Sequence, residues 1–209
     1  MSTMSVARAL IELKTLEKRI QKAQENLQPM GLMIGQKPES GIQNRTEFEK
    51  SAQAMYQQIQ DLIKRRRRLK NAIVLSNAST PVEIAGEKMT VAEAIERKAS
   101  ITIEKDLKNQ LWKKYSEKVQ QLEEHNQKVS RQLFQLLQST YAKPETEVNK
   151  EDYDTIAVPF KENNDASLID PLNLKTLLIQ AETQIDAFEA EVDIALTESN
   201  ARTEITIAD

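Results

Sequence analysis

The chain has 209 residues, of which 29% are charged and only 4% are aromatic, with 4 glycines and no cysteine. This balance is typical of long solvated helices, and it excludes disulfide-stapled folds and thiol chemistry. A net charge of -3 excludes a general attraction to nucleic acid or to anionic membranes. No stretch approaches the roughly 18 apolar residues that a membrane span needs, and charges come too early for a secretory leader. We therefore expect a soluble protein, cytoplasmic where it is made.

Apolar residues spaced three or four apart predict the first two of four helices. The first helix begins with Ser5 as N-cap and ends near Pro29, where a glycine- and proline-rich loop follows. The second begins at a predicted capping box, Thr46 to Glu49. One cation interrupts its 4-3 seam, which indicates a coiled coil. The seam consists of Phe48, Ala52, Met55, Ile59, Leu62, Arg66, Leu69 and Ile73.

The third helix is predicted to be the longest. Residues 82–84 and 88–91 alternate as a β-hairpin, and a capping box from Thr90 to Glu93 starts a helix that we expect to run for about 75 Å. Its far half carries the cleanest heptad, which we interpret as the interface of a homo-oligomer, a dimer or trimer, held through residues 112–137. The interface residues are Trp112, Tyr115, Val119, Leu122, Asn126, Val129, Leu133 and Leu136.

The pattern lapses between residues 142 and 169, which we expect to form an irregular linker with one short strand in "YDTIAVPF". Asp170 and Pro171 are typical of an N-cap and first helical position, so a fourth helix follows. The predicted organisation is a helix-loop-helix, hairpin and long helix over 1–141, the linker over 142–169, and a C-terminal helix and strand over 170–209. We expect these parts to pack as a single structural unit.

A repeat suggests how the helices are arranged. "SNASTPVEIAG" from Ser76 and "SNARTEITIAD" from Ser199 match with an offset of 123 residues, and the match extends back into the preceding helices. Because each copy ends a helix and starts a strand, we expect residues 82–84, 88–91 and 204–207 to share one sheet. The predicted fold is mostly α, an elongated antiparallel helical bundle or coiled coil with a small β-hairpin or three-stranded sheet at one pole.

Three parts of the chain carry a resemblance to known proteins: "ALIELKTLEKRI", "SNASTPVEIAGEKMTVAEAIERK" and, at the end, "IDPLNLKTLLIQAETQID" with "VDIALTESNARTEI". They resemble small, mostly uncharacterised helical proteins of Gram-positive bacteria and their tailed phages. The helix pair leading to Asn-x-Thr, a strand, Gly and Thr-x-x-Glu is similar to septicolysin-like proteins. The resemblance excludes residues 28–45 and 142–168. It implies a helical fold and a phage context, and it transfers no catalytic residue.

The densest charge run is a candidate ligand site for an anionic nucleotide or phosphate. These cations point all around a helix and lack interleaved aromatic residues, so solvated side chains paired to Asp61 are the favoured interpretation. For Arg66 we predict a partly buried ion pair with Glu189 or Glu104. The candidate ligand residues are Lys64, Arg65, Arg66, Arg67 and Arg68.

Other polar residues give weaker signals. His125 has no second ligand of its type nearby, and Asn126 is interpreted as a register-setting residue of the seam. Four carboxylates on the fourth helix could hold a divalent cation, but a solvated face is the favoured interpretation. They are Glu182, Asp186, Glu189 and Asp193. No catalytic motif is present, so we expect no enzyme, no cofactor and no metal.

Two functions remain open. The first is a non-enzymatic helical interaction protein, a homo-oligomer that serves as a structural, assembly or inhibitory component of a phage, with a phage or host protein as a further partner and virion association as a consequence. The second is a sequestrant that binds an anionic nucleotide through residues 65–68. Neither a nucleic acid nor a membrane is an expected partner.

Overall fold

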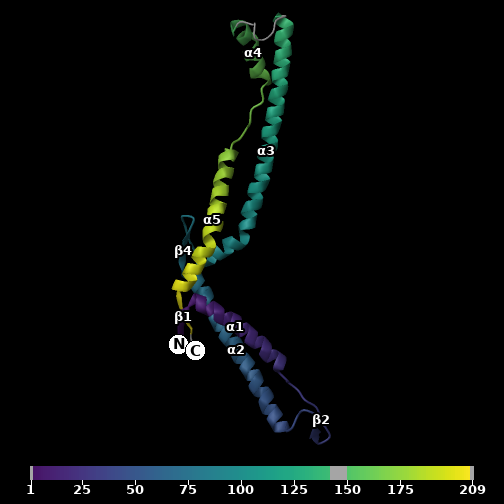
Figure 1. Cartoon of the computed structure of the whole chain (residues 1–209), viewed down its shortest axis with the longest axis vertical. Coiled ribbons are helices and arrows are strands. Elements are labelled where there is room, and N and C mark those ends of the chain that lie inside the picture. Colours follow the sequence, from purple (N-terminus) through teal and green to yellow (C-terminus); the bar gives the residue numbers. More distant parts are fainter. Residues whose placement is uncertain (1, 142–149, 208–209) are drawn as a thin grey trace. The chain divides into compact units, whose positions relative to one another are not determined.

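A computed structural model describes residues 2–141 and 150–207 (Figure 1). The prediction of a mostly helical chain with small antiparallel strand pairs is confirmed. The helices are α1 (Val6–Asn26), α2 (Arg45–Ser79), α3 (Val91–Tyr141), α4 (Lys150–Asn164) and α5 (Leu174–Arg202). The strands are β1 (Ser2–Ser5), β2 (Met33–Ile34), β3 (Lys37–Pro38), β4 (Pro81–Ile84), β5 (Glu87–Thr90) and β6 (Glu204–Ile207).

The chain divides into two compact units. One comprises Met1–Ala99 together with Ala187–Asp209, and the other comprises Ser100–Asp186. The division therefore falls inside α3 and inside α5.

The first unit is built on the antiparallel pair of α1 and α2, which lie side by side (Figure 1). Their apolar stripes meet near the start of α1 and the end of α2, because side chains three and four apart lie on one helix face. Two residues of β6 complete this core. Its buried members are Val6, Ala9, Leu13, Leu16, Leu69, Ile73, Ile205 and Ile207.

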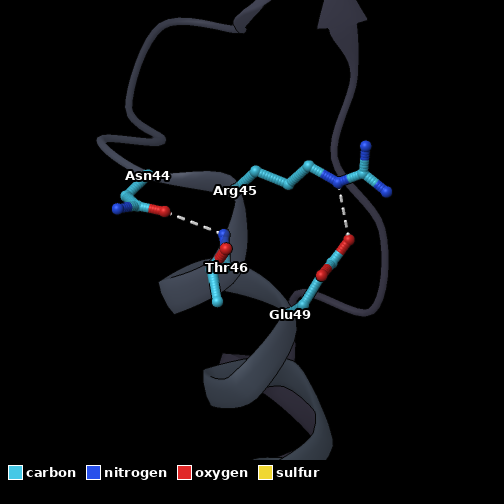
Figure 2. Close-up of polar contacts among 4 residues, drawn as sticks. All are labelled: Asn44, Arg45, Thr46 and Glu49. Atoms are coloured by element: carbon cyan, nitrogen blue, oxygen red, sulfur yellow. Dashed lines mark hydrogen bonds and ion pairs between the residues drawn. The ribbon is translucent and has the colours of Figure 1, made fainter.

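The start of α2 differs from the sequence prediction, as Figure 2 shows. The N-cap is Asn44, whose side-chain oxygen accepts a hydrogen bond from the Thr46 N–H at 2.8 Å. Glu49 instead accepts from Arg45 Nε at 2.8 Å, and this hydrogen bond and the nearby negative charge raise the pKa of Arg45. The predicted capping box from Thr46 to Glu49 is therefore wrong, because Asn is itself a strong N-cap and sits two residues earlier.

The capping box before α3 is confirmed. Glu93 Oε2 accepts from the Thr90 backbone N–H at 2.6 Å and from the Thr90 hydroxyl at 2.9 Å, while the Glu93 N–H donates to the Thr90 hydroxyl at 3.2 Å. The backbone hydrogen bond, followed by the hydroxyl, lowers the pKa of the Glu93 carboxyl. Ser5 likewise caps α1 as predicted, accepting from the Arg8 N–H at 3.3 Å.

The strands form separate antiparallel pairs, β1 with β6, β2 with β3, and β4 with β5. The predicted hairpin of residues 82–91 is thus confirmed, but the expected three-stranded sheet is wrong. Its third strand, β6, pairs with β1, from Ser5 opposite Glu204 to Ser2 opposite Ile207. The physical reason is burial: in this place Ile205 and Ile207 reach the core between α1 and α2.

The second unit contains a helix where the sequence indicated a linker with a short strand. The segment "YDTIAVPF" lies in α4, although Pro159 is inside that helix. Its apolar residues are spaced three and four apart, and they pack on Leu133 and Leu137 of α3. The packed residues are Tyr153, Ile156, Ala157 and Phe160. Burial of this stripe outweighs the strand preference of Thr155, Ile156 and Val158. Residues 142–149 of the expected linker lie outside the described residues.

The start of α5 is shifted relative to the prediction. The helix begins at Leu174 rather than at Pro171. Asp170 still satisfies the exposed amides at this end, since its carboxylate accepts from the Leu174 N–H at 2.7 Å and the Leu172 N–H at 3.3 Å.

The buried strand β6 gives a stability prediction. Replacing Ile207 with alanine should lower the free energy of unfolding by about 2–5 kcal/mol, because it leaves a cavity in the core. Replacing its exposed neighbour Thr206 with alanine should change that energy by less than about 0.5 kcal/mol. Urea unfolding of both variants measures the difference, and equal effects would contradict the placement of β6.

The lowered pKa of Glu93 predicts a pH dependence. The carboxylate is more stable in the folded chain, so its contribution to stability is present above the ordinary glutamate pKa of about 4.3 and is lost as the pH falls through the folded value. An NMR titration should give a Glu93 midpoint below that of exposed glutamates. In Thr90→Ala the midpoint should rise part of the way back, because the backbone hydrogen bond remains.

Candidate functional site

The cationic run on α2 faces carboxylates of α1. Arg65 Nε donates to Glu12 Oε1 at 2.9 Å, and both side chains are partly buried, at 29% and 30% exposed. Arg66 Nη2 donates to Glu17 Oε1 at 2.6 Å, with Nε of the same guanidinium at 3.2 Å. Two of the five candidate ligand residues are therefore occupied by ion pairs within the helical hairpin.

The partner predicted for Arg66 is wrong. The sequence argument placed Glu189 or Glu104 opposite this residue, on the assumption that four helices form one bundle. In the structure α1 supplies the carboxylate, since the helix nearest in sequence also packs against α2. The pair is half-exposed, at 43% for the Arg66 side chain and 54% for that of Glu17, which limits its contribution to stability.

The other three cations do not gather around a common point in this chain. Lys64 Nζ lies 3.8 Å from Asp61 Oδ1, one turn away on the same helix. Arg67 is exposed, and Arg68 lines a shallow groove between α2 and β6 with Leu75 and Ile205. The run thus covers several faces of α2, as its spacing predicts.

The predicted interface on α3 is partly covered by the chain itself. Val129 and Leu133 are buried, and Leu133 packs against Ala157 of α4. The adjacent buried residue is Leu137, whereas the predicted Leu136 is 38% exposed. Val129 and Leu133 are therefore not open to a second copy. At Leu133 the reason is α4, which supplies the apolar partner that the sequence argument assigned to another chain.

Asn126 also has a partner within the chain. Its side-chain amide pairs with the backbone of Ala166: Nδ2 donates to the carbonyl at 3.2 Å and Oδ1 accepts from the N–H at 2.8 Å. Next to it, His125 Nε2 lies 2.8 Å from the Asn164 carbonyl oxygen. Asn126 therefore fixes how the segment that follows α4 aligns along α3.

The part of the predicted interface nearer the start of α3, from Trp112 to Leu122, is more exposed. Trp112 is 48% exposed, and its ring lies 6.0 Å from that of Tyr115 at an angle of 40°. Tyr115, Val119 and Leu122 are each partly buried. This part of the predicted interface keeps an accessible aromatic surface.

The carboxylates of α5 are drawn toward separate partners. Glu182 accepts from Lys108 Nζ at 2.9 Å, and Asp193 pairs with Lys98. Glu191, which the sequence analysis did not single out, accepts from the Ala85 N–H at 2.6 Å. The described residues contain no group of three or more His, Cys, Asp or Glu placed to hold a metal ion.

The loop that joins α1 to α2 carries an exposed surface that the sequence analysis did not identify. Four apolar side chains within residues 30–34, here called the apolar segment, are exposed around strand β2. They are Met30, Leu32, Met33 and Ile34, with exposed fractions from 45% to 85%. The sequence analysis assigned this stretch to an irregular loop, although the run "MGLMI" between Pro29 and Gly35 is a readable signal.

Hydrogen bonds to Glu39 hold the backbone of the apolar segment in place. Glu39 receives the Leu32 N–H at its carboxylate, at 2.9 Å, and its own N–H donates to the Leu32 carbonyl at 2.9 Å. Gly31 lies so close to Ile42 that an added Cβ would be 2.4 Å from its Cδ1. A side chain at position 31 would require the Ile42 side chain to move, while Phe48 Cζ of α2 would lie 3.3 Å from the added Cβ.

The exposure of the Arg66–Glu17 ion pair predicts a weaker coupling between the two side chains than a buried pair would have. A double-mutant cycle of Arg66→Ala and Glu17→Ala should give a coupling energy of about 0–1 kcal/mol, because both side chains are half-exposed. Denaturant unfolding of the four proteins measures it. A coupling above about 3 kcal/mol would indicate a desolvated pair and contradict this geometry.

Comparison of the chain with family models, with curated proteins and with solved structures found no match. In the described parts of the chain, no helix combines the length and the apolar character needed to cross a membrane. Among the described residues, the apolar segment combines exposed apolar side chains with a backbone that is hydrogen-bonded to Glu39.

Proposed function

We propose that the chain is a non-enzymatic helical interaction protein that acts as a homo-oligomer. The observation that carries this proposal is the apolar segment, in which Met30 and Ile34 are 85% and 71% exposed on a loop whose backbone is hydrogen-bonded to Glu39. A contiguous apolar surface on a soluble chain marks an interaction site more often than a random feature. Its two methionines suit a contact that adapts to its partner.

A second copy of the chain is the proposed partner. Residues 29–44 contain one cation, Lys37, and one anion, Glu39. Two such surfaces meet without repulsion between like charges, whereas a strongly charged partner gains little from them. The accessible aromatic surface at Trp112 offers a further contact, while Val129 and Leu133 of the original interface are buried within the chain, Leu133 against α4.

The nucleotide sequestrant has weaker support. Arg65 and Arg66 already neutralise Glu12 and Glu17, so an anionic ligand must compete with two carboxylates held within hydrogen-bond distance. A role as a structural, assembly or inhibitory component of a phage follows only from the sequence resemblance.

The proposal predicts that Ile34→Glu weakens self-association. Burying a carboxylate in the contact is costly, so the variant should be a monomer where the wild type is an oligomer. Sedimentation velocity at tens of micromolar measures this difference. The matched control is Ile103→Glu on α3, whose side chain is 70% exposed and which should leave the oligomer intact. A wild-type monomer at this concentration would contradict the homo-oligomer, and an unchanged Ile34→Glu oligomer would contradict the contact.

A further inference from the structure

The two longer strand pairs of the first unit are copies of one element. Strand β6 follows β4 by 123 residues, and β5 follows β1 by 85. With these offsets each pair of facing residues in β4 and β5 maps onto one in β6 and β1. The matched pairs are Pro81–Thr90 with Glu204–Ser5, Val82–Met89 with Ile205–Met4, Glu83–Lys88 with Thr206–Thr3, and Ile84–Glu87 with Ile207–Ser2.

The match continues into the helix that follows each pair. "MSVARAL" from Met4 and "MTVAEAI" from Met89 align with the same offset of 85. Val6 and Val91 are both buried, as are Ala9 and Ala94. The repeated element is therefore a helix end, two strands and a helix start, and the repeat visible at Ser76 and Ser199 is only its first half.

Backbone hydrogen bonds join the helices in the same way in both copies. The Thr80 N–H donates to the Ser76 carbonyl, and the Thr80 carbonyl accepts from the first N–H of α3, both at 2.9 Å. In the other copy Thr203 makes the same two bonds, at 2.9 Å each, to the end of α5 and the start of α1. Each copy thus ends one helix and caps the next through a single threonine.

The copies differ in one covalent respect. Ala85 and Gly86 link β4 to β5 through a two-residue turn with positive φ at both positions, 52° and 78°. Such a turn matches the twist of the strands, and Glu191 holds the Ala85 N–H at 2.6 Å. No turn links β6 to β1, since Ile207 and Ser2 are connected only through the chain between them.

We propose that the β1–β6 pair is a clasp, which opens before the β4–β5 hairpin does. A strand that separates within a hairpin stays tethered to its partner by the turn as well as by its helix, whereas no turn ties β6 to β1. Burial alone predicts the opposite order, because Ile205 in β6 is buried and its counterpart Val82 is only partly buried.

An open clasp changes the surface of the molecule. Ile205 and Ile207 leave the core, the Val6 N–H loses its Thr203 acceptor, and the edge of β1 becomes free. Opening therefore exposes the second edge of β1 and the core surface that Ile205 and Ile207 cover in the closed molecule.

Amide hydrogen exchange of the full chain tests the order of opening. The amides of Ile205 and Ile207 should exchange about tenfold faster or more than those of Val82 and Ile84, their counterparts in β4. Equal protection in the two copies, or better protection in β6, would overturn the proposal.

A circular permutant separates the missing turn from the sequence of the strands. In it Ile207 is joined to Ser2 by Ala-Gly, copied from residues 85 and 86, and the chain is opened between Ala85 and Gly86. The order of exchange should then invert, so that β4 becomes the faster strand. If β6 remained faster, its sequence and not the missing turn would be the cause.

A second form guards against a permutant that does not fold. Closing the chain into a circle with the same Ala-Gly turn, without a new opening, should slow exchange in β6 to the rate in β4. An unchanged rate in β6 would contradict the clasp.

Discussion

The contact of Ile205 and Ile207 with the ends of α1 and α2 is the interaction on which the first unit depends. Along the 35 residues of α2 only Ile59, Leu69 and Ile73 are buried, so most of this helix gains little from packing. The two isoleucines of β6 close the core where the helix pair is tightest. Because apolar burial is the main favourable term in folding, a four-residue strand has an influence out of proportion to its length.

Polar interactions have a different part in this fold. Among the described residues no polar or charged side chain is classed as buried, and the ion pairs of Arg65 and Arg66 line the edge of the helix pair. Such pairs contribute little free energy but disfavour other helix registers. In the second unit the pairing of Asn126 with Ala166 does this for the segment after α4, through two hydrogen bonds that only one alignment satisfies.

Local patterns predicted most of the helices and failed where the partner is distant. Thr90 and Glu93 were readable because a cap is decided within four residues. Strand β1 was missed because its partner β6 lies some 200 residues further along the chain, and no turn signals the pairing. The helix α4 was missed because Pro159 argues against a helix. Its apolar spacing stabilises the helix only where it packs on Leu133 and Leu137. The apolar segment was readable in composition, but its brace by Glu39 depends on tertiary geometry.

The packing between α1 and α2 changes along the helix pair, from the β1–β6 strands at one end to the apolar segment at the other. The buried residues of α1 end at Leu16, ten residues before the helix does. Beyond that point a groove opens between the helices, lined by Lys22, Ala23 and Met55 among others. A helix pair that is tight at the strands and loose toward residues 30–34 can adjust its open end without disturbing its core. The end that carries the exposed methionines is thus the end with the least packing to lose when a partner binds.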